Sequence, residues 1–135
     1  MKNLLILITF VLFTFSCQIE QKDELTTLKE EVMAMHDEVM PKMSELRYTQ
    51  KALMLQVDSL MSSDSLRSAT LIGASNEIIA ANEAMMNWMR NYEPDYQGTK
   101  EEIISYLEQQ KEAIQKVKND MERSLENGKQ LLVVE

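Results

Sequence analysis

Cysteine, glycine, proline and histidine are all scarce in this chain. Among 135 residues there are one cysteine, three glycines, two prolines and one histidine, and 6% of the residues are aromatic. If the single cysteine is modified, no thiol remains for a disulfide, a zinc site or a catalytic nucleophile. The sequence also has no glycine-rich phosphate loop and no serine–histidine–aspartate set on a plausible scaffold. We therefore expect a protein that is not an enzyme and that is stabilised by packing alone.

An excess of basic residues is also lacking. The chain has 14 lysines and arginines against 22 aspartates and glutamates, which gives a formal charge of −8. Nucleic acids and anionic lipid surfaces both require a basic protein surface. The charge therefore argues against a nucleic-acid partner and against a body that lies flat on a membrane.

The N-terminus combines a single charge at Lys2 with an apolar run from Leu4 to Phe15. That run is shorter than the roughly 20 apolar residues of a membrane span. It fits a signal peptide, with Ser16 as the small residue before the cleavage site. We expect residues 1–16 to be removed, which would leave Cys17 first. Two alternatives stay open: cleavage at another position, with a free thiol, or an uncleaved N-terminal anchor.

Cys17 stands where bacterial lipoproteins carry the cysteine that accepts diacylglycerol, and the segment resembles their signal. Thr14 occupies the position where leucine is usual, and Phe15 is bulky. The resemblance implies lipidation of Cys17, with residues 17–23 as a short polar tether. Each buried methylene contributes about 0.8 kcal/mol, and more than one chain is needed for stable attachment. We expect a cell-envelope protein anchored to the outer membrane, on either its periplasmic or its surface face.

The region from Glu24 to Met61 has the pattern of one long helix. Apolar residues recur every seven positions, which indicates packing against partner helices. Pro41 removes a hydrogen bond and clashes with the preceding turn, so a kink is expected near residues 37–41. The repeat keeps its phase across Pro41, which favours one bent helix over two. The repeating residues are Leu25, Val32, Val39, Leu46, Leu53 and Leu60.

Two further helices are predicted at about residues 64–92 and 99–127. Asp64 or Ser63 supplies an N-cap for the first of these, and Thr99 with Glu102 forms a capping box for the second. Asn127 and Gly128 are typical of a helix stop. The predicted core stripes are Leu71, Ile78, Met85 and Tyr92, then Ile103, Leu107, Ile114, Val117, Met121 and Leu125.

Three amphipathic helices joined by short loops predict an all-α, three-helix antiparallel bundle with long coiled-coil-like helices, over residues 24–132. Self-association as an oligomeric coiled coil is the alternative, because the charged outer faces suit either arrangement.

Two stretches, EVMAMHDEVMPKM (Glu31 to Met43) and ANEAMMNWMRNY (Ala81 to Tyr92), resemble a group of small Bacteroidota lipoproteins. These proteins are commonly labelled "viral A-type inclusion protein", a label that reflects coiled-coil-like composition. The resemblance covers nearly the whole mature chain. It implies lipid anchoring and a helical body, and it adds no mechanism.

Two short motifs are similar to signals of the same phylum. QKDE at residues 21–24 resembles an export signal for the outer face of the outer membrane, and otherwise it begins the first helix. Asp64-Ser65-Leu66 resembles an O-glycosylation sequon, with Ser65 as the acceptor. Helix capping by aspartate and serine is the alternative explanation for this motif.

Methionine is abundant, and several methionines surround the only histidine at helical spacing. Thioether and imidazole groups suit Cu(I), so envelope copper binding is an alternative function. Methionine also fills irregular core gaps, especially beside a tryptophan, and this explanation is favoured. The cofactor prediction is therefore none. The candidate ligands are Met33, His36, Met40, Met43, Met85, Met86 and Met89.

Aromatic residues concentrate around the second loop, at Trp88, Tyr92 and Tyr96. Aromatic side chains are frequent at binding hot spots, so this loop is the best candidate for docking an envelope protein. The alternative is that these rings only cap one end of the bundle. The sequence thus favours a non-catalytic interaction or structural role at the cell envelope.

Overall fold

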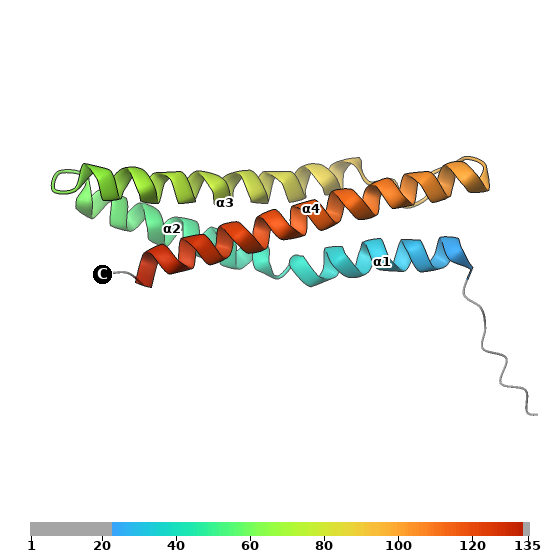
Figure 1. Cartoon of the computed structure of the whole chain (residues 1–135), viewed down its shortest axis with the longest axis horizontal. Helices are drawn as coiled ribbons and strands as arrows, with labels where there is room; N and C mark the ends of the chain where they lie inside the picture. Colours follow the sequence, from blue (N-terminus) through green and yellow to red (C-terminus); the bar gives the residue numbers. More distant parts are fainter. Residues whose placement is uncertain (1–22, 134–135) are drawn as a thin grey trace, which may run out of the picture.

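The computed structural model describes residues 23–133, which form a helical bundle. Its four helices are α1 (Glu24–Val39), α2 (Lys42–Leu60), α3 (Ser65–Asn91) and α4 (Lys100–Val133) (Figure 1). No strand occurs in this part of the chain, so the all-α prediction is confirmed. None of the helices between residues 23 and 133 is both long and apolar enough to cross a membrane. The predicted signal peptide and Cys17 lie outside the described residues.

Pro41 divides the predicted first helix into α1 and α2, and the break at residues 40–41 lies where the sequence predicted a kink. Met40 and Pro41 keep right-handed helical dihedral angles, with φ, ψ of −54°, −42° and −59°, −30°. The backbone therefore continues in a helical path while the hydrogen-bond ladder is interrupted, because proline has no amide proton to donate. The two helices follow one another as parts of one bent rod (Figure 1).

The starts of α3 and α4 are fixed by side-chain caps. The Arg67 amide donates to Asp64 Oδ1 at 2.9 Å, which makes Asp64 the N-cap of α3. At α4 the Thr99 amide donates to Glu102 Oε2 at 2.8 Å, and the Glu102 amide donates to Thr99 Oγ1 at 3.3 Å. This reciprocal pair is the capping box that the sequence predicts.

The last helix is longer than predicted, because α4 continues through Asn127 and Gly128 to Val133. No glycine among the described residues has a positive φ, so Gly128 does not form the left-handed helix cap that an Asn-Gly pair often makes. Gly128 is buried, and a Cβ placed on it would lie 2.8 Å from Thr49 Cγ2 and 2.9 Å from Ile78 Cδ1. The glycine allows α4 to approach α2 and α3 closely.

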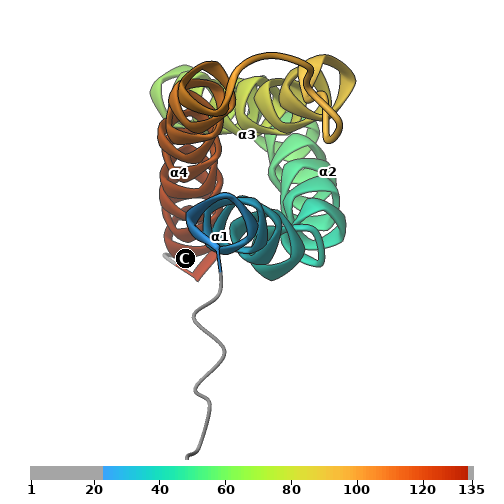
Figure 2. The same ribbon diagram turned by 90° about the vertical axis from the view of Figure 1, so that its right-hand side faces the viewer.

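The helices surround one core, as the view along the bundle shows (Figure 2). α2 packs on α3, and α4 packs on α1, α2 and α3, whereas α1 makes no comparable backbone approach to α3. The core takes one stripe from each helix, as expected for a helix with one buried face. Its fully buried large side chains include Leu46, Leu53, Leu71, Ile78, Met85, Leu107, Ile114 and Met121.

A ladder of four ion pairs joins α4 to α1 and α2 across the surface. Three of the pairs link residues 80 positions apart in the sequence, and the fourth links residues 84 apart. Because this separation is nearly constant, each successive pair lies further along both α4 and the α1–α2 rod. The pairs therefore favour one register between α4 and that rod. The pairs are Lys111–Glu31 at 2.6 Å, Lys118–Glu38 at 2.6 Å, Lys42–Glu122 at 2.7 Å and Lys129–Glu45 at 2.7 Å.

The ladder predicts a loss of stability in acid. Hydrogen bonds from Lys118 and Lys129 hold the pKa values of Glu38 and Glu45 below the ordinary 4.5. A carboxyl whose pKa is lowered by folding stabilises the fold above its unfolded pKa, and this contribution is lost as the pH falls through the folded pKa. We expect the Tm to decrease below about pH 4.5, and to decrease less steeply in Glu38→Gln/Glu45→Gln.

Thermal melts followed by circular dichroism between about pH 7 and pH 3 measure this effect. Glu108→Gln, which changes an exposed carboxylate of α4 outside the ladder, is the matched control and is expected to follow the wild-type curve. High salt is expected to reduce the difference between the double variant and the wild type, because exposed ion pairs are screened. Equal acid slopes for the double variant and the wild type at low salt would contradict the prediction.

Candidate functional site

The three predicted docking residues lie in one row of stacked aromatic rings at the α3–α4 end of the bundle. Trp88 and Tyr92 stack with ring centroids 4.9 Å apart and planes inclined by 18°. Tyr106 of α4 joins the row, with its centroid 6.4 Å from Tyr92 and 4.3 Å from Tyr96. The structure therefore brings together Trp88, Tyr92 and Tyr96, as well as a fourth ring that the sequence analysis missed.

His36 extends the row onto α1. Its ring centroid is 5.7 Å from that of Trp88, and the planes are inclined by 33°. Its Nδ1 lies 2.8 Å from Asp37 Oδ1, a hydrogen bond in which the imidazole donates when Nδ1 carries the proton. The row thus contains His36, Trp88, Tyr92, Tyr106 and Tyr96, and we call it the aromatic row.

The end of α3 positions the rings of the loop. Tyr92 is the C-cap residue, with an extended backbone at φ −73° and ψ 124°, and its amide donates to the Trp88 carbonyl. The next amide, from Glu93, donates to the Tyr106 hydroxyl at 2.7 Å, so the loop is attached to α4. The chain leaves the helix at Tyr92, and this places Tyr96 against Tyr106.

The aromatic row is buried at Trp88 and partly exposed at the three tyrosines. Trp88 is 8% exposed, and its indole Nε1 is buried with no hydrogen-bond partner among residues 23–133. Burial, the neighbouring Tyr106 and Asp95 raise the pKa of the Tyr92 hydroxyl, so Tyr92 is neutral at physiological pH. The row therefore presents uncharged, partly exposed rings beside a hydrophobic support.

The structure divides the candidate copper ligands between the core and the surface. Met85 is fully buried and Met43 is 9% exposed, so both sulfurs serve core packing. Met40 and Met89 pack against the core with part of each side chain exposed. Met33 and Met86 are more exposed, at 37% and 40%. Residues 23–133 contain no group of three or more histidines, cysteines or carboxylates arranged to hold a metal ion.

Two other sequence predictions have simple outcomes. Ser65 is the first residue of α3 and is exposed, immediately after the Asp64 cap. Cys17 lies outside the described residues, so its lipidation stays a prediction.

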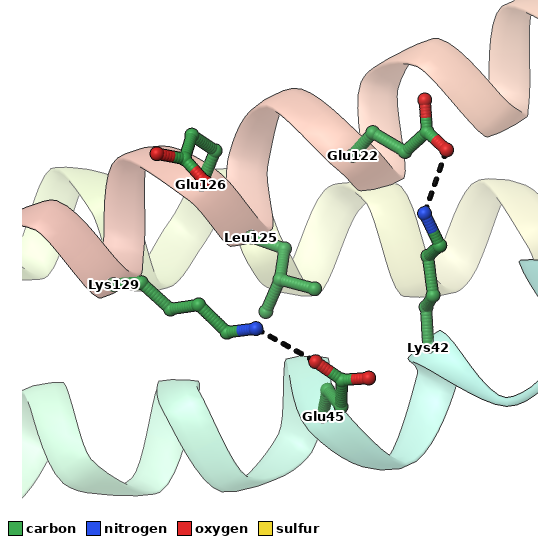
Figure 3. A pocket seen from close by; sticks show the side chains of 6 residues that line it. All are labelled: Lys42, Glu45, Glu122, Leu125, Glu126 and Lys129. Carbon is green, nitrogen blue, oxygen red and sulfur yellow. Dashed lines mark hydrogen bonds and ion pairs between the residues drawn. The ribbon is translucent and has the colours of Figure 1, made fainter.

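Two hollows lie between α4 and the rod formed by α1 and α2. One, of about 360 Å³, is lined by charged side chains around Leu125, and the Lys42–Glu122 and Lys129–Glu45 pairs cross it (Figure 3). The other, of about 480 Å³, is lined by Leu28, Met35, Glu108, Lys111, Glu112 and Gln115. In the first hollow both lysines are already paired with carboxylates, so the charges are used in joining the helices. The aromatic row is the stronger candidate site.

Comparison with family models, with curated proteins and with solved structures found no match for this chain.

Proposed function

We propose that this chain is a lipid-anchored protein of the cell envelope that binds another envelope protein and catalyses no reaction. Its carboxylates support this role, because those that form the ladder pair with lysines on the surface of the bundle. A catalytic acid or base normally requires a buried or otherwise tuned environment.

The proposed anchor is lipid on Cys17, after removal of residues 1–16. The support is the short apolar run, which is followed by Ser16 and then by the only cysteine, and α1 begins at Glu24, a few residues later. Metabolic labelling with a fatty acid, combined with the mass of the mature N-terminus, tests it. We expect label on the wild type and none on Cys17→Ser. A mature N-terminus with an unmodified thiol would refute the anchor and leave the docking proposal to its own test.

We further propose that the bundle is antiparallel, with α3 running against both the α1–α2 rod and α4. Gln50 of α2 donates to Ser75 Oγ of α3, and His36 of α1 lies beside Trp88 of α3. The residue number therefore decreases along the α1–α2 rod, from 50 to 36, while it increases along α3, from 75 to 88. The two chains of residues thus run in opposite directions. The constant offset within the ion-pair ladder supports a common direction for α4 and the α1–α2 rod.

The aromatic row is the proposed docking site, and it carries the proposal. Its rings come from α1, α3, α4 and the loop, so the surface is built by contacts between these elements. Rigid aromatic side chains lose little conformational entropy on binding and supply large contact areas. Tyr96 is the ring at the outer end of the row, on the loop, and is partly exposed.

Site-specific photo-crosslinking in intact cells tests the docking site. A photoreactive residue at Tyr96 is expected to capture one discrete protein of the envelope. The same residue at Tyr48, a highly exposed tyrosine on α2 away from the row, is the matched control and is expected to capture none. Tyr106→Ala should reduce the capture at position 96, since Tyr106 supports the Tyr96 ring. A folded, anchored protein that gives no product above background at position 96 would exclude docking there.

Envelope Cu(I) binding is the second candidate function, and one observation favours it. The Asp37 carboxylate holds Nδ1 of His36, which leaves Nε2 as the ring nitrogen for a ligand. Carboxylates commonly orient metal-binding histidines in this way. Met33 and Met40 are three and four residues from His36 on the same face of α1 and its cap, so they are candidate sulfur ligands.

A Cu(I) competition assay tests this candidate. If copper binding is the function, affinity should be tighter than micromolar, and His36→Gln should weaken it about tenfold or more. Met85→Leu is the control, because a fully buried core sulfur is expected to contribute nothing. Binding weaker than micromolar by the folded chain would exclude copper.

A further inference from the structure

A row of partly exposed apolar side chains follows the α1–α2 rod, in which Met40 and Met54 also pack against the core, and a second row follows α3. Met33, Met40, Met54 and Met61 stand on one seven-residue repeat in which Arg47 occupies the middle position. On α3 the corresponding residues are 38%, 42% and 40% exposed. These are Ile72, Ile79 and Met86. We call the seven apolar residues the methionine face.

The two rows lie on the same side of the bundle. The Gln50–Ser75 hydrogen bond joins α2 to α3, and residues three and four positions away lie on the same helical face. These neighbours are Arg47 and Met54 on α2, and Ile72 and Ile79 on α3. On α1, Met33 and Met40 bear the same relation to His36, which contacts Trp88 of α3. The methionine face therefore borders the seam between α2 and α3 and continues onto α1 beside the His36–Trp88 contact.

α4 packs elsewhere on this seam. Gly128 of α4 sits against Thr49, Leu53 and Ile78, which lie toward the core side of their helices. At this level of the bundle the methionine face therefore lies over α2 and α3, and α4 contacts the other side of these two helices. Its methionines are adaptable side chains that suit a packed interface. Exposed apolar side chains gathered along neighbouring helices commonly mark a contact with another molecule.

We propose that the methionine face binds a second copy of this chain. The face runs from residue 33 to residue 61, about 42 Å of helix, and is two helices wide, about 18 Å. Two such faces would bury about 750 Å² on each copy, close to the ~800 Å² per partner of a standard stable interface. This inference does not rest on the proposed docking or anchoring function.

Charge complementarity gives the geometry of the pair. With a two-fold axis along the rod, the α1–α2 row of one copy lies on the α3 row of the other. The seam contacts set residue 36 level with residue 88, which places Asp37 within a turn of Arg90 on the other copy. The Gln50–Ser75 contact likewise sets Arg47 and Glu83 of the other copy within about 8 Å of each other, measured along the bundle axis.

Both bridges occur twice by symmetry. Within the single chain Asp37 Oδ1 lies 2.8 Å from His36 Nδ1, and a carboxylate has further acceptor sites for Arg90 of the other copy. Arg47, Glu83 and Arg90 form no ion pair among the described residues; Arg47 and Arg90 donate only to Ser44 and Asn87 on their own helices. A two-fold axis perpendicular to the rods would instead place Arg47 near Arg47 of the other copy, and the two positive charges would repel each other. The parallel pair also sets both N-termini at one end.

Sedimentation velocity on the full chain, in a density-matched neutral detergent and with Cys17→Ser to prevent a disulfide, tests the pair. We expect a dimer at tens of micromolar protein. Ile79→Glu should weaken dimerisation about a hundredfold, because a two-fold interface buries the new carboxylate twice. Leu55→Glu, at an exposed leucine of α2 away from the face, should leave the dimer unchanged. Circular dichroism should show unchanged helicity in both variants.

Charge reversal tests the geometry. Asp37→Arg and Arg90→Asp should each weaken the dimer about tenfold, and the double variant should restore it to within about threefold of the starting chain. A chain that is monomeric at 100 micromolar would overturn the proposal, as would a dimer that Ile79→Glu does not weaken. If the chain is monomeric and Ile79→Glu instead abolishes binding to neutral phospholipid vesicles, the face binds lipid and the proposal is wrong.

Discussion

Gly128→Ala is expected to lower the free energy of unfolding by about 1–3 kcal/mol, although alanine is the better helix former. The new methyl group would lie 2.8 Å from Thr49 Cγ2 and 2.9 Å from Ile78 Cδ1. Carbon atoms pack at about 3.5–4.0 Å, so α4 must move away from α2 and α3 or the neighbouring side chains must rearrange. Urea denaturation followed by circular dichroism measures the loss.

Gly73→Ala is the matched control, because Gly73 is also within a helix but a Cβ on it meets nothing within 4 Å. This variant is expected to gain about 0.5–1 kcal/mol from helix propensity alone. Thr49→Ser removes the methyl group that lies nearest to the new Cβ, so it should recover part of the loss in the Gly128→Ala background. Additive effects of Thr49→Ser and Gly128→Ala would show that overpacking at this contact is not the cause.

Trp88→Ala is expected to cost about 3–5 kcal/mol, the range for removing a large buried aromatic side chain. The ring is 8% exposed and packs between His36 of α1 and Tyr92 at the end of α3. Since α1 makes little other approach to α3, the substitution should also loosen α1 at this end of the bundle. Urea denaturation gives the free energy, and near-ultraviolet circular dichroism reports the order of the remaining aromatic rings.

Trp88→Phe tests the packing of the aromatic ring separately from the effect of the indole N–H group. The phenyl ring keeps much of the packing and removes a buried N–H that has no partner among the described residues, and such a group costs about 1–3 kcal/mol. We therefore expect a loss below about 2 kcal/mol for this variant. Tyr48→Ala, at a highly exposed aromatic residue, should change stability by less than about 0.5 kcal/mol. A loss at Trp88→Ala below about 1 kcal/mol would contradict the packing described here.

Much of the fold follows from local patterns in the sequence. The seven-residue repeat identified Val32, Val39, Leu46 and Leu53, all of which are fully buried. The caps at Asp64 and Thr99 were predictable because a cap needs only the residues within one turn. The end of α4 was not predictable in this way. Asn-Gly is locally a helix stop, but the close approach of Thr49 and Ile78 gives Gly128 a packing role inside the helix.

The candidate site was predicted only in part. Trp88, Tyr92 and Tyr96 are neighbours in the sequence, and their clustering was visible there. Tyr106 lies in another helix, beside the core stripe between Ile103 and Leu107, and its contact with Tyr96 depends on how α4 packs against the loop. One signal for the ion-pair ladder was present, since Glu31, Glu38 and Glu45 are seven residues apart. Their lysine partners could be assigned only with the register of α4.

By itself the sequence determined that the chain is helical, where two of the helices begin, and which apolar stripe each helix buries, because these depend on period and on contacts within one turn. Tertiary structure decided the length of α4, the partners in the ladder, the assembly of the aromatic row and the exposure of the methionine face. All four depend on the distance and register between helices. An amphipathic repeat predicts that a helix has a buried side, but it does not identify the helix that packs against that side.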